Sequence, residues 1–219
     1  MSISIKKRYK VTFLFDNNNL WFEKKFKKYD FKLSNKFKFS TTKNYLKVKN
    51  QDIVFPICYT KILNENFLKN NKLTLVVHPS KLPKNKGLAP VAYQVLKNKK
   101  KIYVSAIEAV KEVDAGPIFL QNYFLLDGTE LSDEIRHKQG LSILKMIKAL
   151  LTKYPNIKSV KQIGKGNFNK KRFSKDSELD INKTIKQQFN HLRINDNKRY
   201  PSFFIYKNVK YIIQIFKKK

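Results

Sequence analysis

Hydrophobic runs separated by short polar segments recur through the first 160 residues of the chain. The runs at Tyr9–Phe15, Ile53–Cys58 and Lys72–His78 are rich in apolar and β-branched residues and predict buried strands. The continuous apolar stretch that ends at His78 is typical of a parallel-sheet strand covered on both faces. Pro56 lies inside the second run and predicts an edge position or an irregularity, because proline has no N–H for the ladder.

Helical spacing of apolar residues appears between these runs. Asp16 and Asn17–Asn19 precede apolar residues at helical spacing, and they predict a capped helix. A further helix is expected over residues 89–100, and a long amphipathic helix over residues 130–154.

The alternation of strands and helices continues to about residue 160. A strand is expected over residues 101–110, and another follows the turn at Asp114–Pro117. This order predicts an α/β fold class, with a Rossmann-like core and a mostly parallel sheet. We assign residues 1–160 to this core as the catalytic domain.

Residues 161–219 have a different pattern. They begin with a polar, irregular segment and then predict a short helix near residues 181–196, with Asn182 as its cap. Two apolar runs around Lys207–Asn208 predict a β-hairpin. We therefore expect a small C-terminal helix and β-hairpin extension.

Composition adds an extreme positive charge. The chain has 219 residues, which fits one domain with a small appendage, and its formal net charge is +31. A nucleic-acid or membrane binder is one interpretation. However, only five of the 47 basic residues are arginine, the better reader of phosphates and bases, and the lysines are spread along the chain. This favours a compositional bias, with weak, salt-sensitive attraction to polyanions.

The remaining composition favours a soluble cytoplasmic protein. Cys58 is the only cysteine, so no internal disulfide framework is expected. The N-terminal segment lacks the apolar run of a signal peptide. No stretch approaches the ~20 apolar residues of a membrane span. We expect no metal site.

Two residues behind predicted strands are candidates for catalysis. His78 ends a strand of the α/β sheet, where ligands bind in such folds, and a histidine there can act as acid or base. The alternative is a histidine that only holds a loop. Asp114 follows the next strand, in a turn fixed by Gly116 and Pro117, and can orient His78 or take a proton. Its alternative role is to cap its own turn.

The segment HPSKLPKNKGLAP, followed by EAVKEVDAGPI, resembles the folate-dependent formyltransferases. Their signature is Asn-x-His-x-Ser-x-Leu-Pro-x-x-x-Gly, with an Asp-x-Gly-Pro loop further along the chain. The matching positions are His78, Ser80, Leu82, Pro83, Gly87, Asp114, Gly116 and Pro117. The family's catalytic asparagine corresponds here to Val76, which cannot donate a hydrogen bond. Another group must then supply that stabilisation, or catalysis is weakened or absent.

The resemblance implies transfer of a formyl group from 10-formyltetrahydrofolate to a primary amine. It implies that His78 stabilises the oxyanion or relays a proton, and that Asp114 orients His78 and accepts the proton of the attacking amine. By the same resemblance, the cofactor-binding residues are Cys58, Tyr59, Thr60, Gly87, Asp114 and Gly116. The candidate substrate-binding residues are Ser80, Lys86, Arg193 and Tyr200, with packing of the C-terminal segment as the alternative for the last two.

The acceptor implied by the resemblance is the amine of a nucleotide-linked amino sugar. The region after residue 160 is short for the tRNA-binding barrel of methionyl-tRNA formyltransferases. Modified amino sugars of this kind usually enter surface polysaccharides. The alternatives are a methionyl-tRNA formyltransferase, a glycinamide ribonucleotide formyltransferase, and a catalytically impaired folate-binding relative. Because many relatives form dimers, a homodimer is expected.

Overall fold

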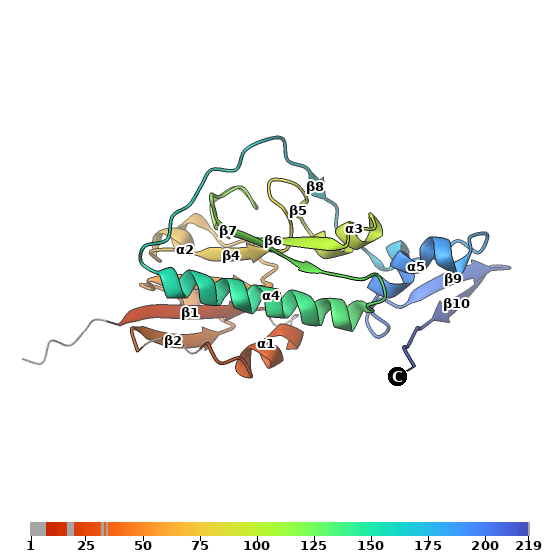
Figure 1. Ribbon diagram of the computed structural model, residues 1–219, viewed down its shortest axis with the longest axis horizontal. Helices are drawn as coiled ribbons and strands as arrows, with labels where there is room; N and C mark the ends of the chain where they lie inside the picture. Colours follow the sequence, from red (N-terminus) through yellow and green to blue (C-terminus); the bar gives the residue numbers. More distant parts are fainter. Residues whose placement is uncertain (1–7, 17–19, 32, 34, 219) are drawn as a thin grey trace, which may run out of the picture.

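Two three-stranded sheets lie side by side at the centre of the molecule. The computed structural model describes residues 8–16, 20–31, 33 and 35–218, and Figure 1 shows their arrangement. One sheet has the strand order β2-β1-β3 and the other β4-β6-β7. In chain order, the helices and strands are β1 (Tyr9–Phe15), α1 (Leu20–Lys27), β2 (Phe37–Thr42), β3 (Ile53–Ile57), α2 (Glu65–Lys69), β4 (Leu75–His78), β5 (Lys86–Gly87), α3 (Pro90–Leu96), β6 (Lys101–Glu108), β7 (Ile118–Leu125), α4 (Ser132–Lys153), β8 (Phe168–Asn169), α5 (Ile185–Ile194), β9 (Ser202–Tyr206) and β10 (Val209–Ile213).

Of the two central sheets, the sheet β2-β1-β3 is parallel and the sheet β4-β6-β7 is antiparallel. β1 pairs in parallel with both β2 and β3, and a parallel bridge between Val54 and Thr74 joins β3 to the start of β4. β6 then pairs antiparallel with both β4 and β7. The loop 109–117 is shorter than the crossover of about a dozen residues that a parallel neighbour needs, so β7 has to run antiparallel to β6. The α/β class is confirmed, and the sheet is mixed.

The strands expected from continuous apolar runs are found where they were predicted. β1 has the predicted bounds, and β3 and β4 lie within theirs. The edge position considered for Pro56 fits the structure, because β3 is the outer strand in the order β2-β1-β3 and only an isolated bridge links it to the start of β4. β4 bridges β3 only at Val54, before Pro56, so the missing N–H falls beyond that pairing.

Sequence patterning missed β2. Its residues, FKFSTT, are exposed at four of six positions, and it is an outer strand of its sheet. A strand that buries so little has no continuous apolar run to reveal it. The helix α1 was predicted, but the proposed caps at Asn17–Asn19 lie outside the described residues.

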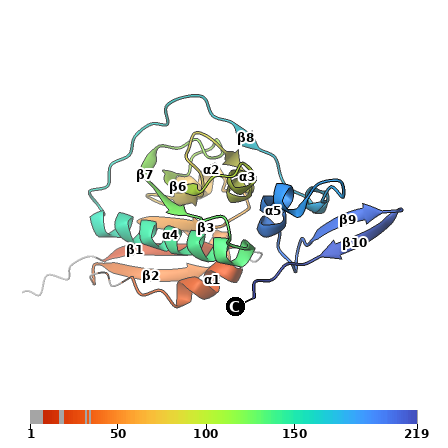
Figure 2. The same cartoon turned by 45° about the vertical axis from the view of Figure 1, so that its right-hand side comes forward.

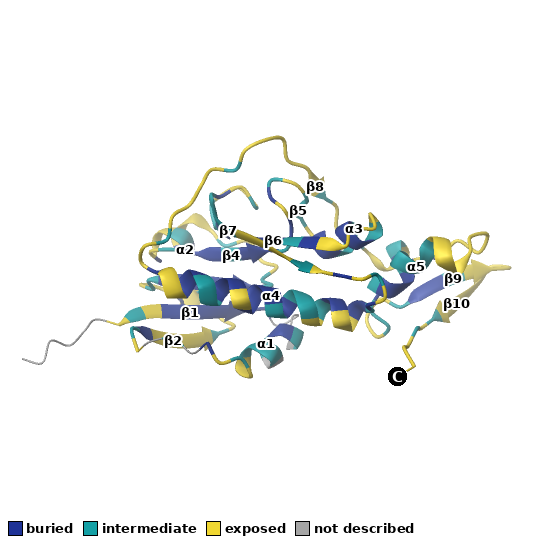
Figure 3. Cartoon of the chain, in the orientation of Figure 1, coloured by how far each residue is buried: buried dark blue, intermediate teal, exposed yellow. Residues whose placement is uncertain are grey.

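The core lies between α4 and the strands of the two central sheets. Ile143, Leu144 and Ile147 of α4 are buried in one cluster with Phe13 of β1 and Phe55 of β3. Burial of each such side chain stabilises the fold by roughly 1.5–3 kcal/mol. Figure 3 shows this buried face of α4 against the strands. The predicted amphipathic stripe is therefore the face that holds α4 on the sheet.

The C-terminal extension contains the expected helix and hairpin. The cap of α5 is Thr184 rather than Asn182, since the Thr184 hydroxyl accepts a hydrogen bond from Gln187 N at 3.3 Å. β9 and β10 are joined at Lys207 and Asn208, both at positive φ, as tight hairpin turns require. Figure 2 shows the hairpin projecting from one end of the molecule. The division at residue 160 stays a proposal.

Candidate active site

The direction of β6 determines how the candidate residues meet. Within the β4–β6 pair, His78 lies opposite Ser105, and Leu75 lies opposite Glu108. The carboxyl ends of the two strands therefore point to opposite edges of the sheet. The loop after β6 has to fold back along β4 to bring Asp114 to His78. The sequence predicts contact between His78 and Asp114, because both are expected at neighbouring strand ends. The contact is found, but the loop that returns along β4 brings Asp114 to His78.

His78 and Asp114 form a buried pair. His78 Nδ1 lies 3.3 Å from Asp114 Oδ1, and the two side chains are 7% and 11% exposed. On the other side of the ring, Nε2 lies 2.9 Å from the carbonyl oxygen of Asn85. Both ring nitrogens thus face acceptors. A doubly protonated imidazole can donate to both, whereas a neutral ring can donate to only one.

The second carboxylate oxygen of Asp114 joins the two signature loops. Gly87 N donates a hydrogen bond to Asp114 Oδ2 at 2.8 Å. Gly87 has a φ of +82°, and a Cβ there would lie 2.9 Å from the carbonyl oxygen of Asn169. Glycine is therefore required at this position both for its backbone angle and for the close approach.

The Asp114 turn depends on a second glycine. A Cβ on Gly116 would lie 1.9 Å from the carbonyl oxygen of Glu108, so no side chain fits there. Asp114 itself has a φ of +53°, in the left-handed region that aspartate tolerates better than most residues. The turn therefore folds against the end of β6 and directs Asp114 towards His78.

The predicted cofactor-binding segment Cys58–Thr60 lies at the end of β3, beside the end of β1. Thr60 donates two hydrogen bonds to Asp16 Oδ2, one from its N–H at 3.0 Å and one from its hydroxyl. Burial, with a smaller contribution from Asp16, raises the pKa of the Cys58 thiol to about 12. Burial likewise raises the pKa of Tyr59. Cys58 is thus a protonated, packed residue rather than a nucleophile.

Asp16, which the sequence predicts only as a helix cap, contacts the predicted cofactor-binding segment through Thr60. It is 4% exposed, directly after β1. The signal that could have found it is its place at the carboxyl end of a parallel strand next to β3.

The predicted substrate residues Ser80 and Lys86 have different surroundings. Ser80 is fully buried, its hydroxyl donates to Lys84 O at 2.8 Å, and its carbonyl accepts from the Ser105 hydroxyl. It therefore shapes the loop. Lys86 is partly exposed, with its ammonium 5.7 Å from the ring centre of Phe168.

Arg193 and Tyr200 lie in the C-terminal extension. Arg193 is 2% exposed, and its guanidinium donates to Glu130 O at 3.1 Å and to Asn190 Oδ1 at 2.7 Å. Burial lowers its pKa. These contacts support the packing role considered for Arg193. Tyr200 is 53% exposed, and no hydrogen bond in the described part of the chain connects either residue to His78.

Val76 occupies the position of the family's asparagine. It lies two residues before His78 on the same face of β4, because side chains alternate along a strand. It is partly buried and has no polar atom in its side chain. The side chain at this position therefore does not supply the amide donor that the signature calls for.

A family model described as "Formyl transferase" matches residues 6–162. The chain belongs to the formyl transferase family. Methionyl-tRNA formyltransferase from Lactobacillus gasseri is 39% identical over 94 residues, which are 42% of this chain and 29% of that protein. The chain thus spans less than a third of the length of this curated relative.

Two solved formyltransferase structures share the fold of this family member. Methionyl-tRNA formyltransferase from Clostridium thermocellum has a TM-score of 0.79 and 23% identity, covering 96% of this chain and 94% of that one. A 4-N formyltransferase from Francisella tularensis has a TM-score of 0.75 and 17% identity, covering 96% and 98%. At these sequence identities the similarity establishes a shared fold, not a shared substrate.

Two features are not found among the described residues. These residues contain no group of three or more His, Cys, Asp or Glu side chains arranged to hold a metal ion. None of their helices combines the length and the apolar character needed to cross a membrane.

Proposed function

We propose that this formyltransferase family member transfers a formyl group from 10-formyltetrahydrofolate to a primary amine. One observation carries the proposal: a buried His78–Asp114 pair is held between the two loops that match the family signature. A histidine and a carboxylate in contact are the groups needed to manage the proton of an attacking amine and the charge on the formyl oxygen.

Beside the Asp114 turn lies one acceptor, unpaired among the described residues, for a ligand with N–H donors, as a pterin has. The side-chain oxygen of Gln162 is buried and has no hydrogen-bond partner among the described residues. The amide nitrogen of the same side chain holds the carbonyls of Asp114 and Gly116, so this unpaired acceptor belongs to the predicted cofactor loop. The folate, when bound, supplies a formyl carbon that an amine can attack.

Asp114 is placed to accept a proton. Among the described residues, each of its oxygens makes one contact, with His78 or with Gly87. A carboxylate can accept about four hydrogen bonds, so acceptor capacity remains for an amine N–H. Its contact with His78 also fixes the orientation of the imidazole.

His78 is placed to donate from Nε2. That nitrogen contacts the Asn85 carbonyl at 2.9 Å. An oxygen that gains negative charge is a stronger acceptor than a neutral carbonyl, so it can compete for the same proton. Because Val76 offers no amide donor, the chain relies on His78 and backbone N–H groups for this stabilisation. A catalytically impaired folate-binding relative remains the alternative if they do not suffice.

For the acceptor, we propose a nucleotide-linked amino sugar, modified in the cytoplasm for surface polysaccharides. The support is the resemblance. The fold itself is shared with both the Francisella tularensis 4-N formyltransferase and the Clostridium thermocellum methionyl-tRNA formyltransferase, so it does not distinguish between the two acceptors. Methionyl-tRNA is the second candidate, because the Lactobacillus gasseri protein similar in sequence is a methionyl-tRNA formyltransferase.

The acceptor is tested by incubating the chain with 10-formyltetrahydrofolate and a panel of candidates. The panel contains nucleotide-linked 3-amino and 4-amino sugars and Met-tRNA, and mass spectrometry detects the gain of a formyl group. We expect a formylated sugar. Formylated Met-tRNA alone would establish the second candidate. Folate binding without any product would support the impaired relative.

A further inference from the structure

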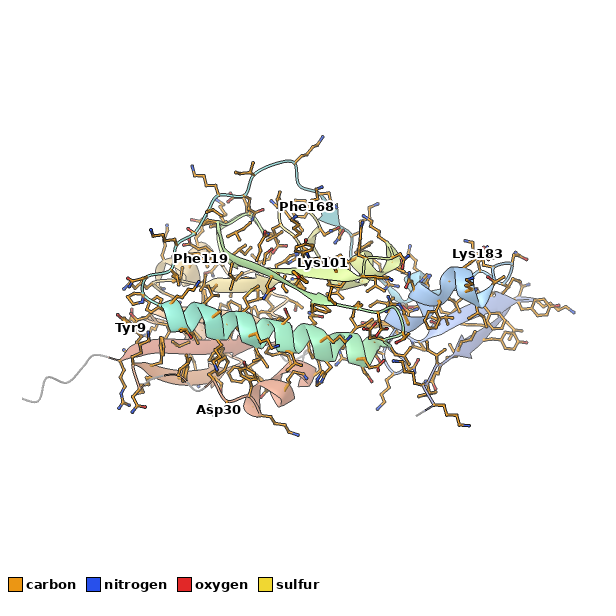
Figure 4. All side chains as sticks on the ribbon, viewed as in Figure 1. Tyr9, Asp30, Lys101, Phe119, Phe168 and Lys183 are labelled. Carbon is orange, nitrogen blue, oxygen red and sulfur yellow. The ribbon has the colours of Figure 1, made fainter. Side chains whose placement is uncertain are left out.

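A strap, defined as residues 161–169, crosses over the two signature loops (Figures 1 and 2). It follows Val160, whose N–H and C=O pair with Ile118 at 2.9 and 2.8 Å. Its large apolar side chains do not anchor it, since Ile163 is 88% and Phe168 is 66% exposed. Figure 3 shows most of the strap as exposed, and Figure 4 labels Phe168 on it. Amide contacts, rather than core packing, hold this segment.

The first amide contact is made by Gln162. Its Nε2 donates hydrogen bonds to Asp114 O at 2.9 Å and to Gly116 O at 2.8 Å. Both N–H donors of the Gln162 amide thus bind carbonyl groups of the turn that carries the Asp114 carboxylate. Because this turn returns along β4 and holds Asp114 at positive φ, its position depends on such anchors.

The second contact is made by Asn167. Its Oδ1 accepts from Asn85 N at 3.0 Å, and its backbone oxygen accepts from Lys86 N at 2.9 Å. The carbonyl of Asn85 is the group that faces His78 Nε2. Asn167 therefore fixes the peptide group that contains the carbonyl facing the imidazole, and also the peptide group before it.

Close backbone contacts keep the strap in place. A Cβ on Gly166 would lie 2.7 Å from the carbonyl oxygen of Pro83. Gly87 pairs with Asn169 in the short β5–β8 ladder. The strap thus touches the His78 loop along its length and the Asp114 turn at Gln162.

We propose that the strap is a positioning element for the His78–Asp114 pair, with Gln162 and Asn167 as its positioning residues. Gln162 fixes the turn that carries the carboxylate, and Asn167 fixes the carbonyl opposite the ring. The proposal rests on the proposed role of the pair in formyl transfer. A displacement of about 1 Å in reacting groups can lower a rate by about 100-fold, so such bracing has a measurable effect.

The first test uses the ring nitrogens of His78 as a reporter that requires no activity. Their ¹⁵N chemical shifts are measured at one fixed pH in the full chain and assigned with a His78→Gln variant. Gln162→Met keeps the side-chain length but removes both donors, so we expect the Nδ1 resonance facing Asp114 to move. Ile163→Ala, next to Gln162 and directed to solvent, is the matched control and should leave the spectrum unchanged.

The second test concerns Asn167. Asn167→Ala removes the acceptor for Asn85 N, and we expect the Nε2 resonance of His78 to move. Asn167→Asp retains an acceptor oxygen for Asn85 N, so the Nε2 resonance of His78 should return to its wild-type chemical shift. In formyl transfer, Asn167→Ala and Gln162→Met should lower kcat about tenfold to 100-fold with a smaller change in KM.

Two sets of results separate this proposal from the proposed function. Unchanged ¹⁵N shifts in folded Gln162→Met and Asn167→Ala would overturn the positioning role, whatever the enzyme activity. Moved shifts in both variants, with rescue by Asn167→Asp, would support it even if no acceptor is formylated. If Gln162→Met does not fold, the comparison of Asn167→Ala with Asn167→Asp tests the positioning role without it.

Discussion

His78 is held through both ring nitrogens, so its orientation depends on two separate neighbours. Asp114 contacts Nδ1 and the Asn85 carbonyl contacts Nε2. The sequence predicted the pairing with Asp114, because the two signature loops occur in the order and at the spacing of the formyltransferase signature. It did not predict the carbonyl contact, since backbone positions within a loop leave no pattern in the residue types.

Val76 is the residue whose replacement most directly probes the missing donor. Val76→Asn places an amide on the same face of β4 as His78. Because one lost oxyanion donor costs about 100-fold or more in kcat, we expect this variant to raise kcat by at least about tenfold. Steady-state rates of the wild type and Val76→Asn give the answer. A folded variant with an unchanged or lower rate would show that another group already fills this role.

Gly116 is predicted to be essential for stability rather than for chemistry. A Cβ there would meet the carbonyl oxygen of Glu108 at 1.9 Å. We expect Gly116→Ala to lower the free energy of unfolding by about 3 kcal/mol, measured by urea denaturation. Gly128→Ala is the comparison variant: its φ of +105° strains the backbone of any side chain, but nothing lies within 4 Å, so we expect a smaller loss. Equal losses for the two variants would contradict the steric account.

At the scale of elements, local signals and long-range pairing differ in how readily they are predicted. β1 and the β9–β10 hairpin were predicted because a continuous apolar run and a two-residue turn are local features. The antiparallel direction of β6 and the exposed strand β2 were not predicted, because partners distant in the chain decide them. The Thr184 cap was missed in favour of Asn182, although Gln187 completes a capping box with threonine.

The junction between α4 and α5 provides a prediction about pH. The Glu130 side chain is 4% exposed, is paired with Lys138, and lies 3.7 Å from the guanidinium of Arg193. Burial raises the pKa of Glu130, but hydrogen bonds from Lys138 and from backbone N–H groups outweigh it, so the pKa lies below the ordinary value of a glutamate. A lowered carboxyl pKa contributes stability that is present above the unfolded value and is lost as pH falls through the folded value.

We therefore expect the free energy of unfolding to fall as pH decreases below about 4.5, and Glu130→Gln to weaken this dependence. Urea denaturation at a series of pH values measures both curves. Asp133→Asn, at a side chain that is 94% exposed, is the control and should follow the wild type. The account fails if the Glu130→Gln curve is as steep as that of the wild type.

At the scale of the whole molecule, the net charge of +31 should act without sequence preference. Lysines spread over the surface attract any polyanion, and the attraction weakens as salt screens it. We expect bulk tRNA and initiator Met-tRNA to bind weakly, with the same affinity and the same salt dependence. Binding titrations at several salt concentrations measure both. A clear preference for initiator Met-tRNA would support the methionyl-tRNA alternative.

The central claim is that the His78–Asp114 pair carries formyl transfer to a primary amine. Its most direct test is the initial rate of product formation, read by mass spectrometry, for the wild type, His78→Ala and Asp114→Asn with the acceptor identified in the panel. We predict losses of about 100-fold or more for both variants, with melting temperatures near that of the wild type and Asp133→Asn fully active. Folded His78→Ala and Asp114→Asn proteins with the wild-type rate would contradict the account.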